Sequence, residues 1–292
     1  MWEVAVRARN EVFMLRMLLL FVLLTLSVAA RAEGYISRML NKPVPGGVAV
    51  VQLGDSPQAP KVSLGEHRVM VLREAAGEWI AVVGIALDTP AGSTQTVTVE
   101  QDGQQRHLTF KVGSKKYVAQ HITLKNSQHV NPSAANLKRF EREWNEQQEA
   151  YRQFSEGMPS NVMLDKPVPG RLSSPFGLQR FFNGEPRNPH SGLDLAAPAG
   201  TAIKAPAAGT VILVGDYFFN GNTVFIDHGQ GFISMFCHLS KVDVKVGQKL
   251  ARGEVLGKVG STGRATGPHL HWNISLNATR VDPAIFIGAF KP

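Results

Sequence analysis

The chain has 292 residues, enough for about two domains, and its 43% hydrophobic and 18% charged residues are typical of a globular protein. Many glycines and prolines favour short strands joined by turns. The single cysteine, Cys237, excludes an intramolecular disulfide, a cysteine-based zinc site and a bacterial lipoprotein, and no Lys/Arg run or basic helix indicates nucleic-acid recognition.

Residues 1–32 have the features of a secretory signal peptide. An apolar run of 14 residues, Met17–Ala30, follows three arginines and is followed by a small-x-small cleavage site. The run is short for a hydrocarbon core of about 30 Å, which favours a cleaved signal over the alternative, an uncleaved membrane anchor. We therefore expect an exported protein that begins near Glu33 and keeps no stable membrane anchor.

Removal of this segment takes away four arginines and two glutamates, so the net charge falls from +8 to +6. A mild positive charge suits an anionic polymer outside the cytoplasm as the partner.

Residues 33–128 are predicted to form a small β-sandwich domain. Six segments alternate or are rich in β-branched residues: GVAVVQLG, HRVMVLRE, WIAVVGIAL, QTVTVEQ, RHLTFKVG and YVAQHITL. Six or seven short strands with turn residues between them are typical of a sandwich.

Residues 129–160 are predicted to form a helical linker. Five apolar residues recur near helical spacing, which predicts one amphipathic helix over about 133–156. Ser133 or Asn131 can cap its N-terminus, and Gly157 ends it. We expect the aromatic residues on this helix to pack and not to form a binding face.

Residues 161–292 return to short strands and glycine turns without a convincing helix. Near the end stands GPHLHWNI. In a β-strand, His269 and His271 would point to one face, with Leu270 and Trp272 on the other. A bare H-x-H motif is weak, because coincidence, a stacked polar pair and a metal site all remain open.

A second motif, H-x-x-x-D, is formed by His190 and Asp194. Pro189 and Gly192 argue against a helix here, but a bent extended segment can bring both side chains to one point. Histidine and carboxylate are good zinc ligands. A carboxylate in an apolar run needs a cation or strong hydrogen bonds, so an aspartate bonded to turn amides is the alternative.

His190, Asp194 and one of the two histidines of H-x-H together make three ligands. Three protein ligands leave one zinc position open, as in a catalytic site. The spare histidine could then act as a base or a transition-state donor, and His238, in ISMFCHLS, is a further candidate. No H-E-x-x-H motif supplies a glutamate base, so histidines would have to carry the protons.

Three segments in order, PHSGLDLAAPAGTAIKAPAAGTV, GNTVFIDHGQGFISMFCHLS and VKVGQKLARGEVLGKVGSTGRATGPHLHWNI, resemble the lysostaphin/LytM-type zinc metallopeptidases, which are peptidoglycan endopeptidases. The resemblance covers about Ser173–Pro283. It implies an all-β fold, in which a LytM-type antiparallel β-sheet peptidase domain, similar to a barrel-sandwich hybrid, follows the small β-sandwich domain and the linker helix. The upstream β-rich part also looks like the N-terminal region of bacterial members.

The resemblance implies a role for each of five residues. The family's H-x-x-x-D falls on His190 and Asp194, as zinc ligands. Its H-x-H places the third ligand at His271 and a catalytic histidine at His269. Its lone histidine before leucine, the other catalytic histidine, falls on His238. The cofactor is then one Zn²⁺ per chain.

The segment before the first ligand looks like the groove-lining segment of the family. Arg180, Phe182 and Asn183 are therefore predicted to contact substrate. Phe236 and Cys237 depart from the tyrosine and the small residue that the family often has before the lone histidine, and we expect no loss of chemistry from either.

These roles imply an exported zinc-dependent endopeptidase that hydrolyses the stem-peptide cross-links of peptidoglycan, with a zinc-activated water and two histidines. We expect a periplasmic location, with secretion as the alternative, and direct D-alanyl–diaminopimelate cross-links as substrate, with oligoglycine bridges as the alternative.

Three rival functions differ in class: a catalytically silent family member that activates or scaffolds other wall hydrolases, a biotinyl- or lipoyl-type carrier, and a wall-binding structural protein. The complete ligand set favours an enzyme, and no modifiable lysine at a hairpin tip supports a carrier. The N-terminal domain would bind the wall, recruit a regulatory protein partner or restrain the groove.

Overall fold

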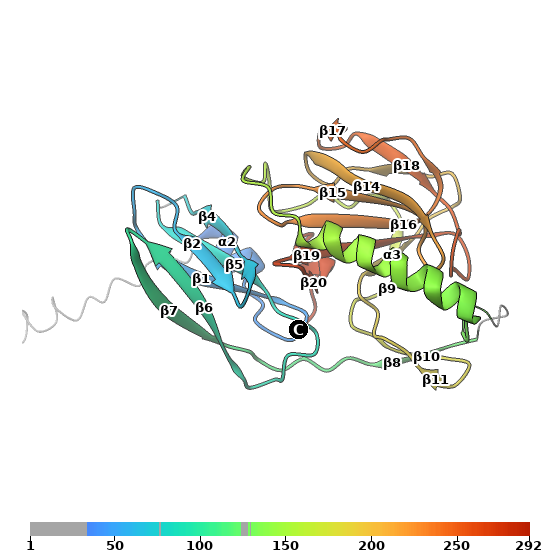
Figure 1. The fold of residues 1–292 in the computed structure, drawn as a ribbon, viewed down its shortest axis with the longest axis horizontal. Coiled ribbons are helices and arrows are strands. Elements are labelled where there is room, and N and C mark those ends of the chain that lie inside the picture. Colours follow the sequence, from blue (N-terminus) through green and yellow to red (C-terminus); the bar gives the residue numbers. More distant parts are fainter. Residues whose placement is uncertain (1–33, 76, 124–127, 129) are drawn as a thin grey trace, which may run out of the picture. The chain divides into compact units, whose positions relative to one another are not determined.

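The computed structural model describes residues 34–75, 77–123, 128 and 130–292, and the predicted signal peptide lies outside them. Residues Tyr35–Pro292 form one compact unit, built mainly of β-strands (Figure 1). This architecture confirms the all-β prediction. Within the described ranges, no helix is both long enough and apolar enough to cross a membrane.

The N-terminal part is a β-sandwich, as predicted. A short helix, α2 (Tyr35–Leu40), precedes it. One sheet has the strand order β1-β5-β4 and the other the order β3-β2-β6-β7. The strands are β1 (Val48–Gly54), β2 (Lys61–Leu64), β3 (His67–Arg68), β4 (Met70–Arg73), β5 (Trp79–Gly84), β6 (Thr94–Gln101) and β7 (Gln104–Lys111).

Strand β5 is buried on both faces, which explains its continuous apolar sequence. Ala81 and Val83 belong to the core between the two sheets of the sandwich. Ile80 and Val82 belong to the core that continues into the C-terminal part. The side chain of Asn277 joins the same parts, because it bonds both backbone groups of Gly84.

The prediction that YVAQHITL forms a strand of the sandwich is wrong. This segment forms β8 (Ala119–Ile122), which pairs in parallel with β10 (Gln179–Phe182), and β10 pairs in turn with β11 (Glu185–Pro186). Strand alternation identifies a half-buried strand but not its partner, and the partner of β8 is about 60 residues away in the chain.

Helix α3 (Ala134–Arg152) begins after Ser133, whose Oγ accepts a hydrogen bond from the N–H of Asn136. It ends earlier than predicted, because the backbone at Gln153 turns to an extended conformation. Tyr151 is buried, with its ring centroid 5.0 Å from that of Phe225. The helix therefore packs on the C-terminal sheet and is part of its core, more than a linker.

The C-terminal sheet has ten antiparallel strands. Its main path runs β17-β14-β15-β16-β19-β12-β9, while β13, β18 and β20 pair beside it. The strands are β9 (Arg171–Ser174), β12 (Leu193–Ala196), β13 (Ala202–Lys204), β14 (Gly209–Tyr217), β15 (Gly221–Asp227), β16 (Ile233–Val242), β17 (Lys249–Leu250), β18 (Val255–Val259), β19 (His269–Leu276) and β20 (Thr279–Val281), followed by the 3-10 helix η2 (Pro283–Ile285).

Strand β19 alternates between two environments. Leu270 and Trp272 are fully buried in the main core. On the opposite face Asn273 donates a hydrogen bond to the hydroxyl of Tyr151 on α3. His271 lies on the same face as Asn273, because residues two apart in a strand share a face.

Candidate metal centre

Three adjacent strands, β16, β19 and β12, carry four of the five histidine and aspartate positions that the sequence singles out, and the fifth, His190, lies just before β12. Asp194 of β12 is opposite His271 of β19, and Ala196 is opposite His269. Residues opposite each other on antiparallel strands share a face. The strand order therefore brings these side chains to one side of the sheet.

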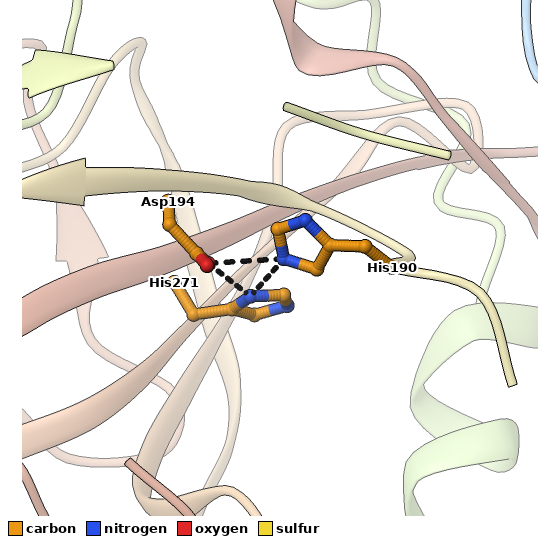
Figure 2. Close-up of side chains that lie close together, drawn as sticks. All are labelled: His190, Asp194 and His271. Atoms are coloured by element: carbon orange, nitrogen blue, oxygen red, sulfur yellow. Dashed lines mark hydrogen bonds and ion pairs between the residues drawn. The ribbon is translucent and has the colours of Figure 1, made fainter. Parts of the chain in front are cut away.

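His190, Asp194 and His271 converge on one point (Figure 2). His190 Nε2 lies 3.0 Å from Asp194 Oδ1 and 3.0 Å from His271 Nδ1. Asp194 Oδ1 lies 2.7 Å from His271 Nδ1. All three residues are buried. They form the cluster of potential metal ligands found in the described part of the chain.

The hydrogen bonds of His190 show that this cluster suits a cation. His190 Nδ1 lies 2.7 Å from the carbonyl oxygen of Pro175, so Nδ1 carries a proton and donates it. Burial lowers the pKa of His190 to about 4, although Asp194 opposes the shift. At neutral pH the ring is thus neutral and turns the lone pair of Nε2 toward a carboxylate oxygen and a second imidazole. Two imidazoles and a carboxylate facing one point are a zinc-type donor set.

Asp194 is a carboxylate held in its charged form. Burial alone would raise its pKa, but His190 and His271 together hold the pKa well below the usual range. The Arg180 guanidinium also lies close, with Nη2 3.4 Å from Asp194 Oδ2. One carboxylate oxygen therefore faces the histidines and the other faces an arginine.

The rings of His238 and His269, beside this cluster, are each held by a hydrogen bond from Nδ1 to a backbone carbonyl oxygen, as the ring of His190 is. His238 Nδ1 donates to the carbonyl oxygen of Thr262 at 2.8 Å, and His269 Nδ1 donates to that of Gly267 at 2.8 Å. In each ring, Nε2 takes no part in these hydrogen bonds. The two ring centroids are 4.8 Å apart, and His269 Nε2 lies 4.0 Å from Asp194 Oδ1.

His238 adopts a strained backbone conformation, with φ of 65°. It lies at an irregularity between β15 and β16, where the register shifts between Asn222 and Val224. Strand β16 continues past this histidine to Val242. Burial lowers the pKa of His238 to about 3, so the ring is neutral at pH 7.

The cluster opens into a cleft of about 320 Å³. Arg180 and Phe182, both predicted to contact substrate, line this cleft. Asn183 is not among its lining residues, since it occupies an exposed turn at φ of 52° and its N–H bonds the carbonyl oxygen of Ile122.

Sequence reasoning missed several residues of the cleft wall, among them Gln120, Ile122 and Arg264. Gln120 and Ile122 reach it from β8 through the parallel pairing with β10. Arg264 reaches it from the loop before β19. The segment GRATGPH contains this arginine between glycines, but nothing in a single sequence indicates that the loop turns back over the cleft.

Family models match two parts of the chain. Peptidase family M23 matches residues 188–283, and the peptidase family M23 N-terminal domain matches residues 41–115. The first match contains all five residues of the metal cluster and its flanking histidines. Strand β8, which lines the cleft, lies outside both matches.

A crystal structure from Pseudomonas aeruginosa, described as a peptidase M23, is 59% identical to this chain with a TM-score of 0.76. The similarity covers 88% of this chain and 100% of that chain.

Among curated proteins, the peptidoglycan DD-endopeptidase ShyA of Vibrio cholerae is 40% identical over 113 residues. The DD-carboxypeptidase/endopeptidase Mpg of Neisseria meningitidis is 42% identical over 113 residues. These matches cover 38% and 39% of this chain and 26% of each relative, so the chain spans about a quarter of their length.

Proposed function

Because the chain belongs to peptidase family M23, we propose that it is an exported zinc-dependent endopeptidase that hydrolyses the peptide cross-links of peptidoglycan. One observation carries the proposal. Three buried zinc-type ligands converge at the base of a cleft, and two further histidines stand beside them with one ring nitrogen each outside their hydrogen bonds.

In this proposal His190 Nε2, Asp194 Oδ1 and His271 Nδ1 hold one Zn²⁺. A bound zinc ion supplies Lewis acidity, which lowers the pKa of a water molecule and polarises a carbonyl group. The hydrogen bond from His190 Nδ1 to Pro175 fixes the tautomer that turns Nε2 to the ion.

The two flanking histidines carry the protons. His238 and His269 both keep Nδ1 in a hydrogen bond to a backbone carbonyl, so Nε2 of each is the atom that exchanges protons at the cleft. One accepts the proton of the attacking water at Nε2. The imidazolium so formed stabilises the tetrahedral oxygen and gives this proton to the leaving amine, directly or through the other histidine.

The names of the curated relatives support the choice of substrate. ShyA is named a peptidoglycan DD-endopeptidase and Mpg a DD-carboxypeptidase/endopeptidase. We therefore propose D-alanyl–diaminopimelate cross-links as the substrate and the periplasm as the location. Oligoglycine bridges and secretion are the second choices.

The rival function is a catalytically silent activator or scaffold of other wall hydrolases. Such a protein does not need its ligands or its proton-carrying histidines. Here His190, Asp194 and His271 are within hydrogen-bonding distance of each other, and His238 and His269 are in place beside them. The intact arrangement favours the enzyme.

The test combines metal analysis with product analysis. Zinc content of the mature protein is measured by mass spectrometry, and cross-linked sacculi are incubated with the same sample before their muropeptides are profiled. We expect about one zinc per chain and conversion of dimeric muropeptides to monomers. Zinc without cleavage would instead favour a restrained enzyme, and neither zinc nor cleavage would favour the scaffold.

A matched control uses the same preparation after chelation. Chelator should abolish cleavage, and added zinc should restore it. Retained cleavage in the zinc-free protein would contradict a zinc enzyme.

A further inference from the structure

A second hollow, of about 340 Å³, lies beside helix α3, which runs along the C-terminal sheet (Figure 1). Its lining residues are Phe140, Glu141, Trp144 and Asn145 of the helix and Asn188 of the segment before β12. Small-molecule sites have volumes of about 300–1,000 Å³, so this hollow is large enough for a ligand. The mechanism proposed for the metal centre uses none of these five residues.

Trp144 gives the hollow an aromatic wall. The sequence favours a packing role for the aromatic residues of α3, and Tyr151 is buried against Phe225, but Trp144 is 39% exposed. Arg280 holds the indole in place, because its guanidinium carbon lies 5.5 Å from the ring centroid and its Nη1 donates to Gln148 Oε1 at 3.2 Å. A fixed, partly exposed indole is a stacking surface that needs no reordering when a ligand binds.

Polar side chains surround this indole. Glu141 and Asn145 are four residues apart, so they lie on one side of the helix, and Asn188 joins them from the segment before β12. All three are exposed. The two carboxamides can donate and accept hydrogen bonds, and the carboxylate accepts them.

This lining fits a neutral sugar better than a peptide. A pyranose ring has a face of C–H groups that packs on an aromatic ring, and its hydroxyl and N-acetyl groups bond amides and carboxylates. Of the described residues that line the hollow, none is a cation, and Glu141 would repel the free carboxylates of a stem peptide. An amphipathic peptide helix would need a longer apolar groove.

Phe219 connects this hollow with the cleft of the metal centre. Its ring centroid lies 5.1 Å from that of Phe140, which lines the hollow, and 4.1 Å from the guanidinium carbon of Arg264, which lines the cleft. Glu143 fixes α3 to the same loop, because its Oε2 accepts a hydrogen bond from the N–H of Phe218 at 2.8 Å. The hollow and the cleft are therefore neighbouring parts of one surface.

We propose that this hollow is a glycan subsite, which binds an N-acetylated pyranose of the strand that carries the scissile stem peptide. This proposal rests on the proposed function. Peptidoglycan is a polymer of such sugars with stem peptides attached, so a cleft that holds a cross-link has a glycan strand near it. Trp144 stacks on the apolar face of the sugar, while Asn145 and Asn188 bond its N-acetyl and hydroxyl groups. The enzyme then prefers cross-links still attached to glycan over free peptides.

The first experiment measures sugar binding without turnover. The probe is chitotetraose, a β-1,4-linked oligomer of N-acetylglucosamine that carries no peptide, and calorimetry on the mature protein gives its dissociation constant. We expect binding by the wild-type protein and about 10-fold weaker binding by Trp144→Ala. Trp144→Phe, which keeps an aromatic ring, should retain most of the affinity.

The matched control is Leu137→Ala. Leu137 is an exposed apolar residue of the same helix that does not line the hollow, so this variant should bind chitotetraose as the wild-type protein does. No binding by the wild-type protein, or equal affinities in the wild-type protein and Trp144→Ala, overturns the subsite. Binding of a sugar-free stem peptide that Trp144→Ala abolishes, without binding of chitotetraose, would make the hollow a peptide site and overturns it as well.

The second experiment measures cleavage by the zinc-loaded mature protein. Two cross-linked dimers have the same peptides, and only one of them carries a disaccharide on each stem. We expect kcat/KM to be about 10-fold higher for the glycosylated dimer, mainly through a lower KM. In Trp144→Ala this ratio should fall toward one, mainly through loss on the glycosylated dimer, and Leu137→Ala should keep the wild-type ratio.

The two experiments separate the two proposals. Equal kcat/KM for both dimers in the wild-type protein overturns the glycan subsite and leaves the endopeptidase intact. No cleavage of either dimer overturns the proposed function, while the affinities for chitotetraose still decide whether the subsite exists.

Discussion

Asp194 and His271 lie directly opposite each other on antiparallel strands, with Asp194 Oδ1 2.7 Å from His271 Nδ1. Gly192, just before β12, makes this contact possible. A Cβ on Gly192 would lie 2.0 Å from Asn273 Oδ1 and 2.7 Å from His271 Nε2. With no side chain there, the His271 ring packs its Nε2 edge against the backbone and turns Nδ1 toward Asp194.

The first prediction separates ligand from proton carrier within the H-x-H motif. His271→Ala should lose zinc and activity together, because Nδ1 is one of the three converging atoms. His269→Ala should keep about one zinc per chain and lose at least about 100-fold in turnover, the usual contribution of a general acid or base. Zinc content and kcat measured on the same samples check both.

The two variants are matched, since each removes one imidazole from the same strand face. Their stability should be compared first by thermal unfolding of the metal-free proteins. If His269→Ala lost zinc while His271→Ala kept it, the two roles would have to be exchanged.

The second prediction concerns two glycines that flank β10. Gly177 and Gly184 have nearly equal positive φ values, 84° and 86°. A Cβ on Gly177 would lie 2.0 Å from the Tyr117 ring, whereas a Cβ on Gly184 meets nothing within 4 Å. Gly184→Ala should cost about 1 kcal/mol of unfolding free energy, from backbone strain alone.

Gly177→Ala should cost about 1–3 kcal/mol more than Gly184→Ala, because it adds an overlap to the same strain. The hydroxyl of Tyr117 donates to the carbonyl oxygen of Pro45 at 2.7 Å, so the ring is not free to move away. Urea unfolding of both variants measures the difference. Equal losses of unfolding free energy in the two variants would show that the Tyr117 ring moves aside at little cost.

The prediction that His269 and His271 share a face is correct, because side chains two residues apart in any β-strand point to the same side of the sheet. The β-sandwich could also be predicted, from the regular spacing of turn residues between short strands. Pairing partners do not follow from local pattern. The pairing of β8 with β10, the loop of Arg264 over the cleft and the opposition of Asp194 to His271 all depend on which distant segments meet, and one sequence holds no local signal for that.

The third prediction is the pH dependence of the metal-free protein's stability. Burial lowers the pKa of His228, of His190 to about 4 and of His238 to about 3. The unfolded chain has ordinary values near 6.5, so it binds protons that the folded chain does not. Stability should be full above about pH 6.5 and should fall as the pH decreases toward 4.

His228 offers a test away from the proposed site. Its Nδ1 donates to the carbonyl oxygen of Ala208, and its Nε2 accepts from the hydroxyl of Ser234. His228→Gln should lower stability at pH 7, where these bonds are lost, but should make the loss between pH 6.5 and 4 shallower than in the wild-type protein. Urea midpoints at several pH values check the slope, and parallel curves for the two proteins would contradict the assignment.

The fourth prediction uses Cys237 as a reporter of metal binding. Its side chain is buried, burial raises the pKa of its thiol to about 12, and it is the register partner of His271. A thiol reagent should therefore react only when this part of the sheet opens. In the proposed function zinc binds the closed state, so saturating zinc should slow labelling in proportion to the zinc concentration divided by its dissociation constant.

The control for this reporter is His271→Ala, in which zinc should no longer slow the labelling of Cys237. His269→Ala should keep the zinc effect, since its metal ligands are intact. The rates are measured with excess reagent on native protein, without substrate, so they report metal binding independently of catalysis. Fast labelling of the wild-type protein that zinc does not change would mean that the sheet around His271 opens without releasing the metal, and the link between this strand pair and the metal would be wrong.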